Sequence, residues 1–259
     1  MKTLKSAPFV GAALLGLVSV PVVAQDAGIP GEFSANVGIF SDYQFRGISQ
    51  SDDNLALQGG IDYELDTGFK ETALYLGVWG SNVDFNDGDE ASLELDLYGG
   101  LSGSAMGLDW HGGVIGYLYP GASDSLNYDF FELTAGVSRA ITDTIEVGLG
   151  YNYSPDYFAS SGSAHYLQAT TTVGIPLPDS MTKYGLGLDV AAGLGRQWIQ
   201  DNDVFGTPDY WTWSLGAAMT YKMLTLGVSY VDTDLSDNDC FGGTEFCEAR
   251  VIGYLQASF

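Results

Sequence analysis

The chain has 259 residues, of which 33 are acidic, nine are basic and 35 are glycine, and its formal net charge is −24. So few lysines and arginines could not neutralise a phosphate backbone, which argues against nucleic acid as a partner. No interior run of about eighteen apolar residues occurs, and the sequence therefore predicts no membrane-spanning helix beyond the N-terminus.

The first 24 residues have the pattern of an export signal peptide. Lys2 and Lys5 precede an apolar run from Phe9 to Val18, and the small residues around Ala24 are suitable for cleavage. No linker or change of composition divides the remainder. We therefore expect residues 1–24 to be removed and residues 25–259 to form a single domain.

From residue 33 onward, apolar and polar residues alternate in segments of roughly ten residues, as transmembrane strands require. The sequence predicts an all-β fold, a transmembrane antiparallel up-and-down β-barrel of about twelve strands. An even number of strands places both termini on the same side, the periplasm. The predicted segments are 33–47, 54–65, 71–82, 91–102, 107–119, 127–138, 144–154, 164–175, 184–197, 209–220, 223–232 and 248–259.

The connections between these segments alternate strictly between short and long. Short periplasmic turns and long extracellular loops are typical of outer-membrane barrels. The short connections lie at 66–68, 102–106, 139–143, 176–183 and 221–222. The long ones, rich in Asp, Asn, Ser and Gly, lie at 48–53, 83–90, 120–129, 155–163, 198–209 and 232–248.

The final segment, Arg250 to Phe259, alternates with period two and ends on an aromatic residue. A transmembrane barrel must pair its last strand with its first, because no backbone edge can face lipid. The alternative is an edge strand of a soluble β-sandwich. A terminal Phe259 resembles the C-terminal signature of bacterial outer-membrane proteins, and we expect the barrel-assembly machinery to recognise it.

Nine acidic residues lie within the predicted strands, on the faces that carry Gly, Ser, Thr, Asn or Gln rather than aliphatic residues. An acid facing lipid at mid-membrane would cost roughly a few kcal/mol, so these faces must look into the lumen. Two basic residues also fall on the faces that are expected to point inward. The predicted pore-lining residues are Asp42, Arg46, Asp62, Glu64, Glu94, Asp96, Asp109, Glu132, Glu146, Asp189 and Arg250.

Aromatic residues gather near the ends of the predicted strands, where the interfacial girdles of barrels lie. Tyr43 and Phe45, near the outer end of the first segment, are assigned to such a girdle. In the third segment Tyr75 and Trp79 share one face and aliphatic residues share the other, so the pattern does not decide which face is inward.

The run S-D-Y-x-F-R-G-x-S-Q at residues 41–50 resembles the TorF-type porin family. Further similar stretches lie at 57–63, 76–85, 93–100 and 116–120, all in the first half of the mature chain. The resemblance implies an outer-membrane barrel that conducts solutes, and it implies no particular substrate. The two cysteines near the C-terminus are not part of the family pattern.

Arg46 and Arg250 have two readings. In the functional one they form a cationic spot near the mouth, between the neighbouring first and last strands, that orients an anionic group or narrows the passage. In the structural one they neutralise Asp42, Glu94 or other nearby acids and brace the wall. Nine inward acids against two inward arginines favour neutral or cationic solutes.

Cys240 and Cys247 are the only cysteines, which suits an oxidising compartment and one disulfide that staples the longest outer loop. Such a short loop predicts roughly 2–3 kcal/mol of stabilisation. The acidic stretches 84–90 and 232–239 have no EF-hand spacing and read as solvated surface rather than as a metal site. Bridging by divalent cations to lipopolysaccharide phosphates is a further use for them. No cofactor is expected.

The sequence thus predicts an outer-membrane porin for passive diffusion of small hydrophilic solutes, embedded in lipid and lipopolysaccharide. The alternative is a non-conducting barrel with an adhesive or envelope-structural role. A hydrolase at the rim is a third reading, but it would need His111 or His165 to contact both a hydroxyl and a carboxylate. We therefore expect no enzymatic activity.

Overall fold

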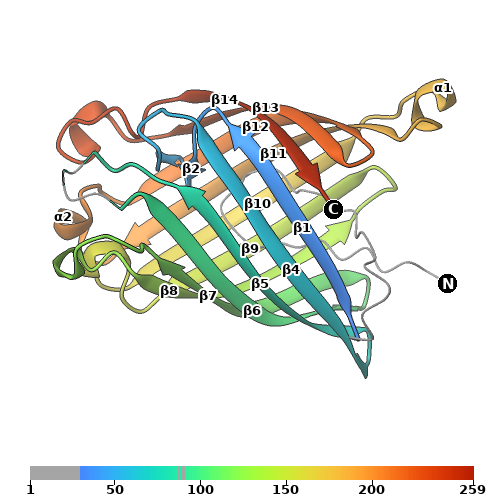
Figure 1. Cartoon of the computed structure of the whole chain (residues 1–259), viewed down its shortest axis with the longest axis horizontal. Coiled ribbons are helices and arrows are strands. Elements are labelled where there is room, and N and C mark those ends of the chain that lie inside the picture. Colours follow the sequence, from blue (N-terminus) through green and yellow to red (C-terminus); the bar gives the residue numbers. More distant parts are fainter. Residues whose placement is uncertain (1–29, 87, 89–90) are drawn as a thin grey trace.

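The computed structural model describes residues 30–86, 88 and 91–259, and the predicted signal peptide lies outside the described residues. Twelve antiparallel strands form one closed barrel (Figure 1), which confirms the predicted fold. A separate two-stranded sheet, β2 (Gln44–Phe45) and β3 (Ile48–Ser49), does not pair with the barrel. The barrel strands are β1 (Glu32–Phe40), β4 (Ala56–Phe69), β5 (Thr72–Asn82), β6 (Leu93–Ala105), β7 (Leu108–Leu118), β8 (Phe130–Ala140), β9 (Ile145–Ser154), β10 (Ala164–Gly174), β11 (Leu186–Ile199), β12 (Tyr210–Tyr221), β13 (Leu224–Thr233) and β14 (Arg250–Ser258).

The barrel closes where β1 pairs with β14, in a register that runs from Asn36 opposite Ser258 to Phe40 opposite Tyr254. The last residue takes part in the closure. The Phe259 amide donates to the Ala35 carbonyl at 2.8 Å, and the Ala35 amide donates back at 3.0 Å. The final segment is thus a central strand and not the free edge of a sandwich.

The two ends of the barrel differ. At the turn end, where Phe259 lies, connections are short, and one of them contains the helix α1 (Asp179–Thr182). At the opposite loop end, the longer connections carry the helical turns η1 (Asp124–Leu126), η2 (Phe158–Ser160), α2 (Asn202–Phe205) and η3 (Asp237–Asp239). None of these helices in the described chain is long and apolar enough to cross a membrane.

The two faces of the wall follow the predicted alternation. Aliphatic side chains on the outer face are exposed, for example Leu57, Leu133 and Leu215 at 59 %, 51 % and 57 %. In β5, where the sequence pattern was ambiguous, the aromatic face is the inner one. Trp79 packs edge-on against the buried ring of Tyr43, with 5.5 Å between the ring centroids.

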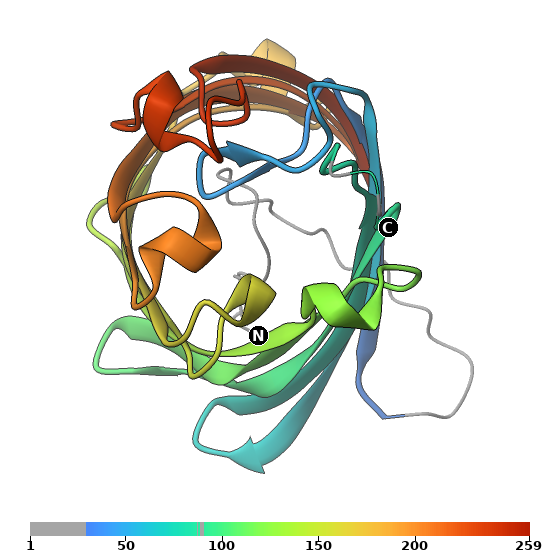
Figure 2. The same cartoon turned by 90° about the vertical axis from the view of Figure 1, so that its left-hand side faces the viewer.

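The structure corrects the first predicted strand, which ends at Phe40 rather than at residue 47. Residues 41–55, here called the inner hairpin, fold into the barrel (Figure 2). The turn between β2 and β3 consists of Arg46 and Gly47, both with positive φ (51° and 85°), as a two-residue type I′ turn requires. Asp42 and Arg46 are therefore not part of the barrel wall.

Gly100 on β6 lies directly opposite Gly113 on β7, and a Cβ atom at Gly100 would come within 2.2 Å of the Gly112 carbonyl oxygen. Because that neighbour is backbone, Gly100→Ala should destabilise the barrel by about 1–3 kcal/mol in urea unfolding in detergent micelles. Gly150→Ala is the control, since a Cβ there meets nothing within 4 Å. Equal stability of the two variants would contradict the close approach.

Candidate functional site

The inner hairpin is organised around the buried carboxylate of Asp42. One of its oxygens accepts hydrogen bonds from the hydroxyls of Ser49 and Ser51 at 2.7 and 2.8 Å. The other accepts from the side-chain amide of Gln44 at 2.5 Å. Asp42, predicted to line the pore, instead joins the two arms of the hairpin.

The tip of the hairpin reaches the opposite wall of the barrel through Arg46. Its guanidinium donates to Glu132 on β8 at 2.6 Å and to Gln197 on β11 at 2.9 Å. The same group lies over the ring of Tyr166 on β10, 4.3 Å from the centroid. Burial by itself lowers the pKa of Arg46, but the charge of Glu132, the hydrogen bond to it and the nearby phenols of Tyr157 and Tyr117 together raise that pKa, so the guanidinium stays charged. Arg46, Glu132 and Gln197 are here called the latch.

The turn of the hairpin also packs tightly against the wall. A Cβ atom at Gly47 would lie 2.5 Å from Cγ2 of Thr233 on β13 and 2.7 Å from the hydroxyl of Thr212 on β12. Glycine at this position thus serves both the positive φ and the close approach. Together with the latch, this contact fixes the hairpin against four strands that do not neighbour β1, namely β8, β11, β12 and β13.

A second buried carboxylate, that of Glu94, accepts hydrogen bonds from two tyrosine hydroxyls. The hydroxyls of Tyr43 and Tyr119 donate to the two oxygens of Glu94 on β6, at 2.6 and 2.7 Å. Burial raises the pKa of both tyrosines and the charge of Glu94 raises it further, so both remain donors. Tyr43 was assigned from sequence to the membrane girdle, as was Phe45, whose ring packs against Tyr117 inside the barrel. Both assignments are wrong.

Aromatic side chains fill the loop end around these acids. The ring of Phe85 lies 5.5–5.6 Å from those of Tyr119, Tyr128 and Phe158, which come from two other connections. Phe130 stacks on Tyr117 at 4.4 Å. Figure 2 shows η1, η2 and α2 around the same opening. The loop end of the lumen is thus occupied by the hairpin and by packed rings.

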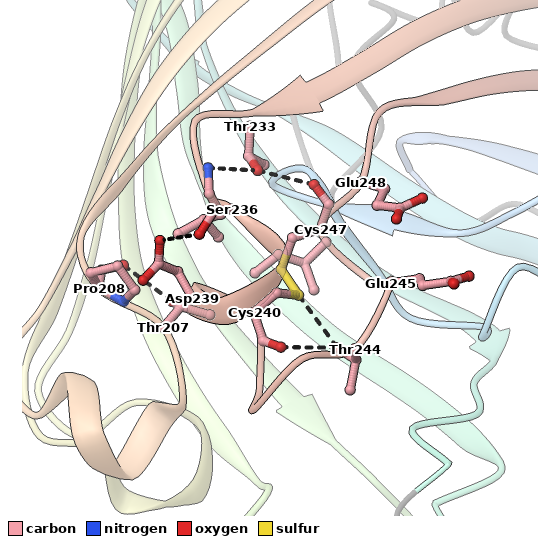
Figure 3. Close-up of a disulfide and its surroundings, with 12 residues drawn as sticks. Thr207, Pro208, Thr233, Ser236, Asp239, Cys240, Thr244, Glu245, Cys247 and Glu248 are labelled. Carbon is pink, nitrogen blue, oxygen red and sulfur yellow. Dashed lines mark hydrogen bonds between the residues drawn. A yellow bond between two sulfur atoms is a disulfide. The ribbon is translucent and has the colours of Figure 1, made fainter.

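The predicted disulfide between Cys240 and Cys247 is present (Figure 3). The loop that it closes contacts the hairpin directly, because the Ser49 amide donates to the Phe246 carbonyl at 2.8 Å. Ile48 packs in one buried cluster with both cysteines and Tyr210. The disulfide therefore closes its own loop, and that loop also holds the inner hairpin in place.

Arg46 and Arg250 were predicted to lie together near the mouth, but each has its own partners. Arg250 binds Asp53 at 2.6 Å and approaches Glu248 at 4.0 Å, whereas Arg46 binds Glu132. This arrangement matches the structural reading of the pair, with acids other than the expected Asp42 and Glu94. The pairing of Arg46 with Glu132 spans 86 positions of the chain and has no local sequence signal.

The remaining predicted pore residues lie on the inner faces of their strands, as expected. Their role in lining a pore stays a prediction. Glu94, Asp96 and Glu132 are buried, at 1 %, 2 % and 1 % exposure. Towards the turn end, Asp62 accepts a hydrogen bond from Tyr98, and Asp109 accepts one from Ser104. Glu64, Glu146 and Asp189 are half-buried on the inner faces of β4, β9 and β11.

His165 is not part of a triad within the described chain. Nδ1 of His165 lies 2.6 Å from the hydroxyl of Tyr151, and no carboxylate among the described residues orients its ring. His111 lies on the inner face, with its ring over Gly136, where a Cβ atom would come within 2.3 Å of it. The described part of the chain also has no group of three or more His, Cys, Asp or Glu side chains placed to hold a metal ion.

A family described as "Bacterial protein of unknown function (Gcw_chp)" matches residues 24–259. The chain belongs to this family. No curated protein matches the sequence significantly. The family is defined by sequence over the whole barrel, and its description assigns no activity.

Solved structures share the barrel fold. An outer membrane channel from Pseudomonas putida F1 superposes with a TM-score of 0.52 at 13 % identity, covering 91 % of this chain and 97 % of that one. The NanC porin matches with a TM-score of 0.49 at 10 % identity, covering 88 % and 98 %. LpxR from Salmonella typhimurium matches at 0.46 and 12 %, covering 87 % and 99 %. At these identities the likeness concerns the fold alone.

Glu132→Gln should release the hairpin tip, because it leaves the buried Arg46 guanidinium without its ion-pair partner. Breaking one side of a buried pair costs about 3–5 kcal/mol. We expect a loss of that order in urea unfolding, with faster protease cleavage within residues 41–55. Glu146→Gln, an inward acid outside the described ion pairs, should change stability by less than about 0.5 kcal/mol. Unchanged cleavage in Glu132→Gln would contradict the latch.

Replacing both Cys240 and Cys247 by Ser should cost roughly 2–3 kcal/mol, the value for a short closed loop. It should also loosen the hairpin, because the Phe246 carbonyl that receives the Ser49 amide lies within that loop. Hydrogen exchange followed by mass spectrometry would detect faster exchange at residues 48–50. Exchange at wild-type rates there would show that the hairpin does not depend on the disulfide.

Proposed function

We propose that the protein is an outer-membrane channel for passive diffusion of small hydrophilic solutes, neutral or cationic, with the inner hairpin as its constriction. The observation that carries the proposal is the way in which the hairpin is held. It forms its own two-stranded sheet outside the barrel ladder. It is held by side-chain contacts such as the latch, by the disulfide loop, and by backbone hydrogen bonds near its two ends, from the Ser41 amide to the Gly253 carbonyl and from the Asp84 amide to the Gln50 carbonyl. Such a segment can move without opening the wall.

The charge of the inner face supports the preference for neutral or cationic solutes. Of the two inward arginines, Arg46 is neutralised by Glu132, and Arg250 by Asp53. Acids such as Asp62, Asp109 and Asp189 face the lumen nearer the turn end, where no described basic side chain pairs with them. Rows of carboxylates in a narrow passage repel anions at short range.

The proposal includes an orientation and a location. Both termini are periplasmic, and the long acidic loops face outward towards lipopolysaccharide, as in barrels with short periplasmic turns. Residues 1–24 direct export, residues 25–259 form the single barrel domain, and Phe259 addresses the barrel-assembly machinery. The resemblance of residues 41–50 to TorF-type porins supports the same assignment, and it falls on the inner hairpin itself.

One observation favours the alternative, a non-conducting barrel with an adhesive or envelope-structural role. The hairpin, the latch and the aromatic rings are buried together at the loop end, so that Tyr43, Tyr117 and Gln197 are at most 2 % exposed. Under this reading the packing is permanent and the acidic loops carry the function. We propose no enzymatic activity in either case.

Single-channel recording of the refolded protein in planar bilayers distinguishes the channel from the non-conducting barrel. We expect discrete steps with a reversal potential that shows cation preference. Arg46→Gln should raise the conductance, because it frees the tip, and together with Arg250→Gln it should strengthen the cation preference. Arg196→Gln is the control, because this outward-facing arginine lies between Trp198 and Trp211 and does not reach the lumen.

Silence from a folded wild-type barrel, with steps only after the hairpin tip is altered, would assign a closed resting state. Absence of current steps in both the wild type and the variant with the altered hairpin tip would overturn the channel proposal and leave the structural role. Anion preference in the wild type would overturn the solute class.

A further inference from the structure

Three buried carboxyl groups lie on the inner face of the barrel, on two strands separated by β7. Glu94 and Asp96 belong to β6 and Glu132 to β8, and each is at most 2 % exposed. The charges of Glu94 and Glu132 both act on Asp96. The described cation within this group is Arg46, which is bound to Glu132. Three carboxyl groups thus meet one positively charged side chain in the interior.

Two of the three acids are compensated by hydrogen bonds. Glu94 accepts from the phenols of Tyr43 and Tyr119. Glu132 accepts from Arg46, and also from Asn152 at 3.0 Å and Tyr117 at 3.2 Å. A buried carboxylate without such donors is costly, and proteins pair it, protonate it or bind a cation to it.

Asp96 is the acid that lacks this compensation. Its Oδ1 atom is buried and receives no hydrogen bond, although the residue is 2 % exposed. No ion pair of the described chain involves it. The structure therefore leaves one acceptor atom, next to two further carboxylates, without a partner of its own.

Aromatic side chains flank this carboxylate. Trp79 on β5 and Tyr117 on β7 are directly opposite Asp96 in the two neighbouring strands, on the same inner face. Directly opposed Cβ atoms in antiparallel strands are roughly 4.5–5.5 Å apart. The faces of Trp and Tyr rings attract cations through their quadrupole. A buried carboxylate that lacks a donor, with an aromatic side chain opposite it on each neighbouring strand, favours a cation.

We propose that Asp96 binds a small monovalent cation, an alkali-metal or ammonium ion, between the side chains of Trp79 and Tyr117. One bound positive charge compensates the carboxylate that lacks a donor and lowers the repulsion from Glu94 and Glu132. A divalent ion fits less well, because Ca²⁺ and Mg²⁺ need six or more oxygen ligands, usually with several carboxylates. The described chain places no three such side chains around one point.

This inference does not rest on conduction, because the ion compensates a buried charge whether the barrel is open or closed. It predicts that small cations stabilise the fold by mass action, as any ligand that binds only the folded state does. The salt dependence would therefore follow the identity of the cation and not only the ionic strength.

The test is thermal unfolding of the refolded full chain in detergent micelles, in chlorides of potassium, sodium, ammonium and N-methyl-D-glucamine at equal ionic strength. The bulky N-methyl-D-glucamine ion cannot enter a site between two side chains. We expect the wild-type Tm to be a few degrees higher in at least one small-cation salt, and to rise with its concentration. Asp96→Asn, which keeps the shape of the side chain, should abolish the difference.

Asp189→Asn is the matched control. Asp189 is also an inward acid, on β11, but it is half-buried and away from the aromatic pair. This variant should keep the full cation dependence. Asp96→Asn should fold at least as well as the wild type in N-methyl-D-glucamine, since it removes the uncompensated charge, so that loss of the dependence cannot be mistaken for misfolding.

Two outcomes would overturn the site. Equal wild-type Tm in all four salts, with a protonated-carboxyl infrared band that Asp96→Asn removes, would show that a proton compensates Asp96. A cation dependence that survives in Asp96→Asn would place the binding elsewhere, such as the acidic loops. Neither outcome depends on the bilayer recordings, so failure here and failure of the channel proposal are distinguishable.

Discussion

Closure of the backbone ladder is the constraint on which the rest of the structure depends. In hydrocarbon, an unpaired N–H or C=O group has no water to bind, so every strand needs two neighbours. The pairing of β1 with β14, continued by Phe259 and Ala35, supplies the last of them. Once the ring is closed, period-two alternation leaves only two environments for a side chain, lipid outside and the enclosed lumen inside.

The enclosed lumen explains the unusual chemistry of the interior. A polar residue on the inner face cannot turn to the membrane, so it must bind water, another side chain or a segment folded into the ring. The inner hairpin meets this need at the loop end. It brings Arg46 to Glu132 and Tyr43 to Glu94, two contacts that a twelve-stranded wall alone would not provide.

Much of this fold could be predicted from the sequence, because strand periodicity and the alternation of short and long connections are local signals. The number of strands, the closure at Phe259 and the disulfide were all predicted correctly. The inner hairpin was not. Residues 41–47 continue the alternation of β1, with Asp42, Gln44 and Arg46 on one face, and this pattern alone suits a longer strand. The strand ends for reasons that alternation does not record, the positive φ at Arg46 and Gly47 and partners far along the chain.

The position of the latch within the ring has a consequence for assembly. Arg46 is attached to β1, but Glu132 and Gln197 lie on β8 and β11, which reach β1 only around opposite sides of the barrel. In a flat or partly built sheet these strands are far from the hairpin, and only curling brings them within its reach. The latch can therefore form only once the sheet has curved, and its contacts stabilise the curved form over the flat one.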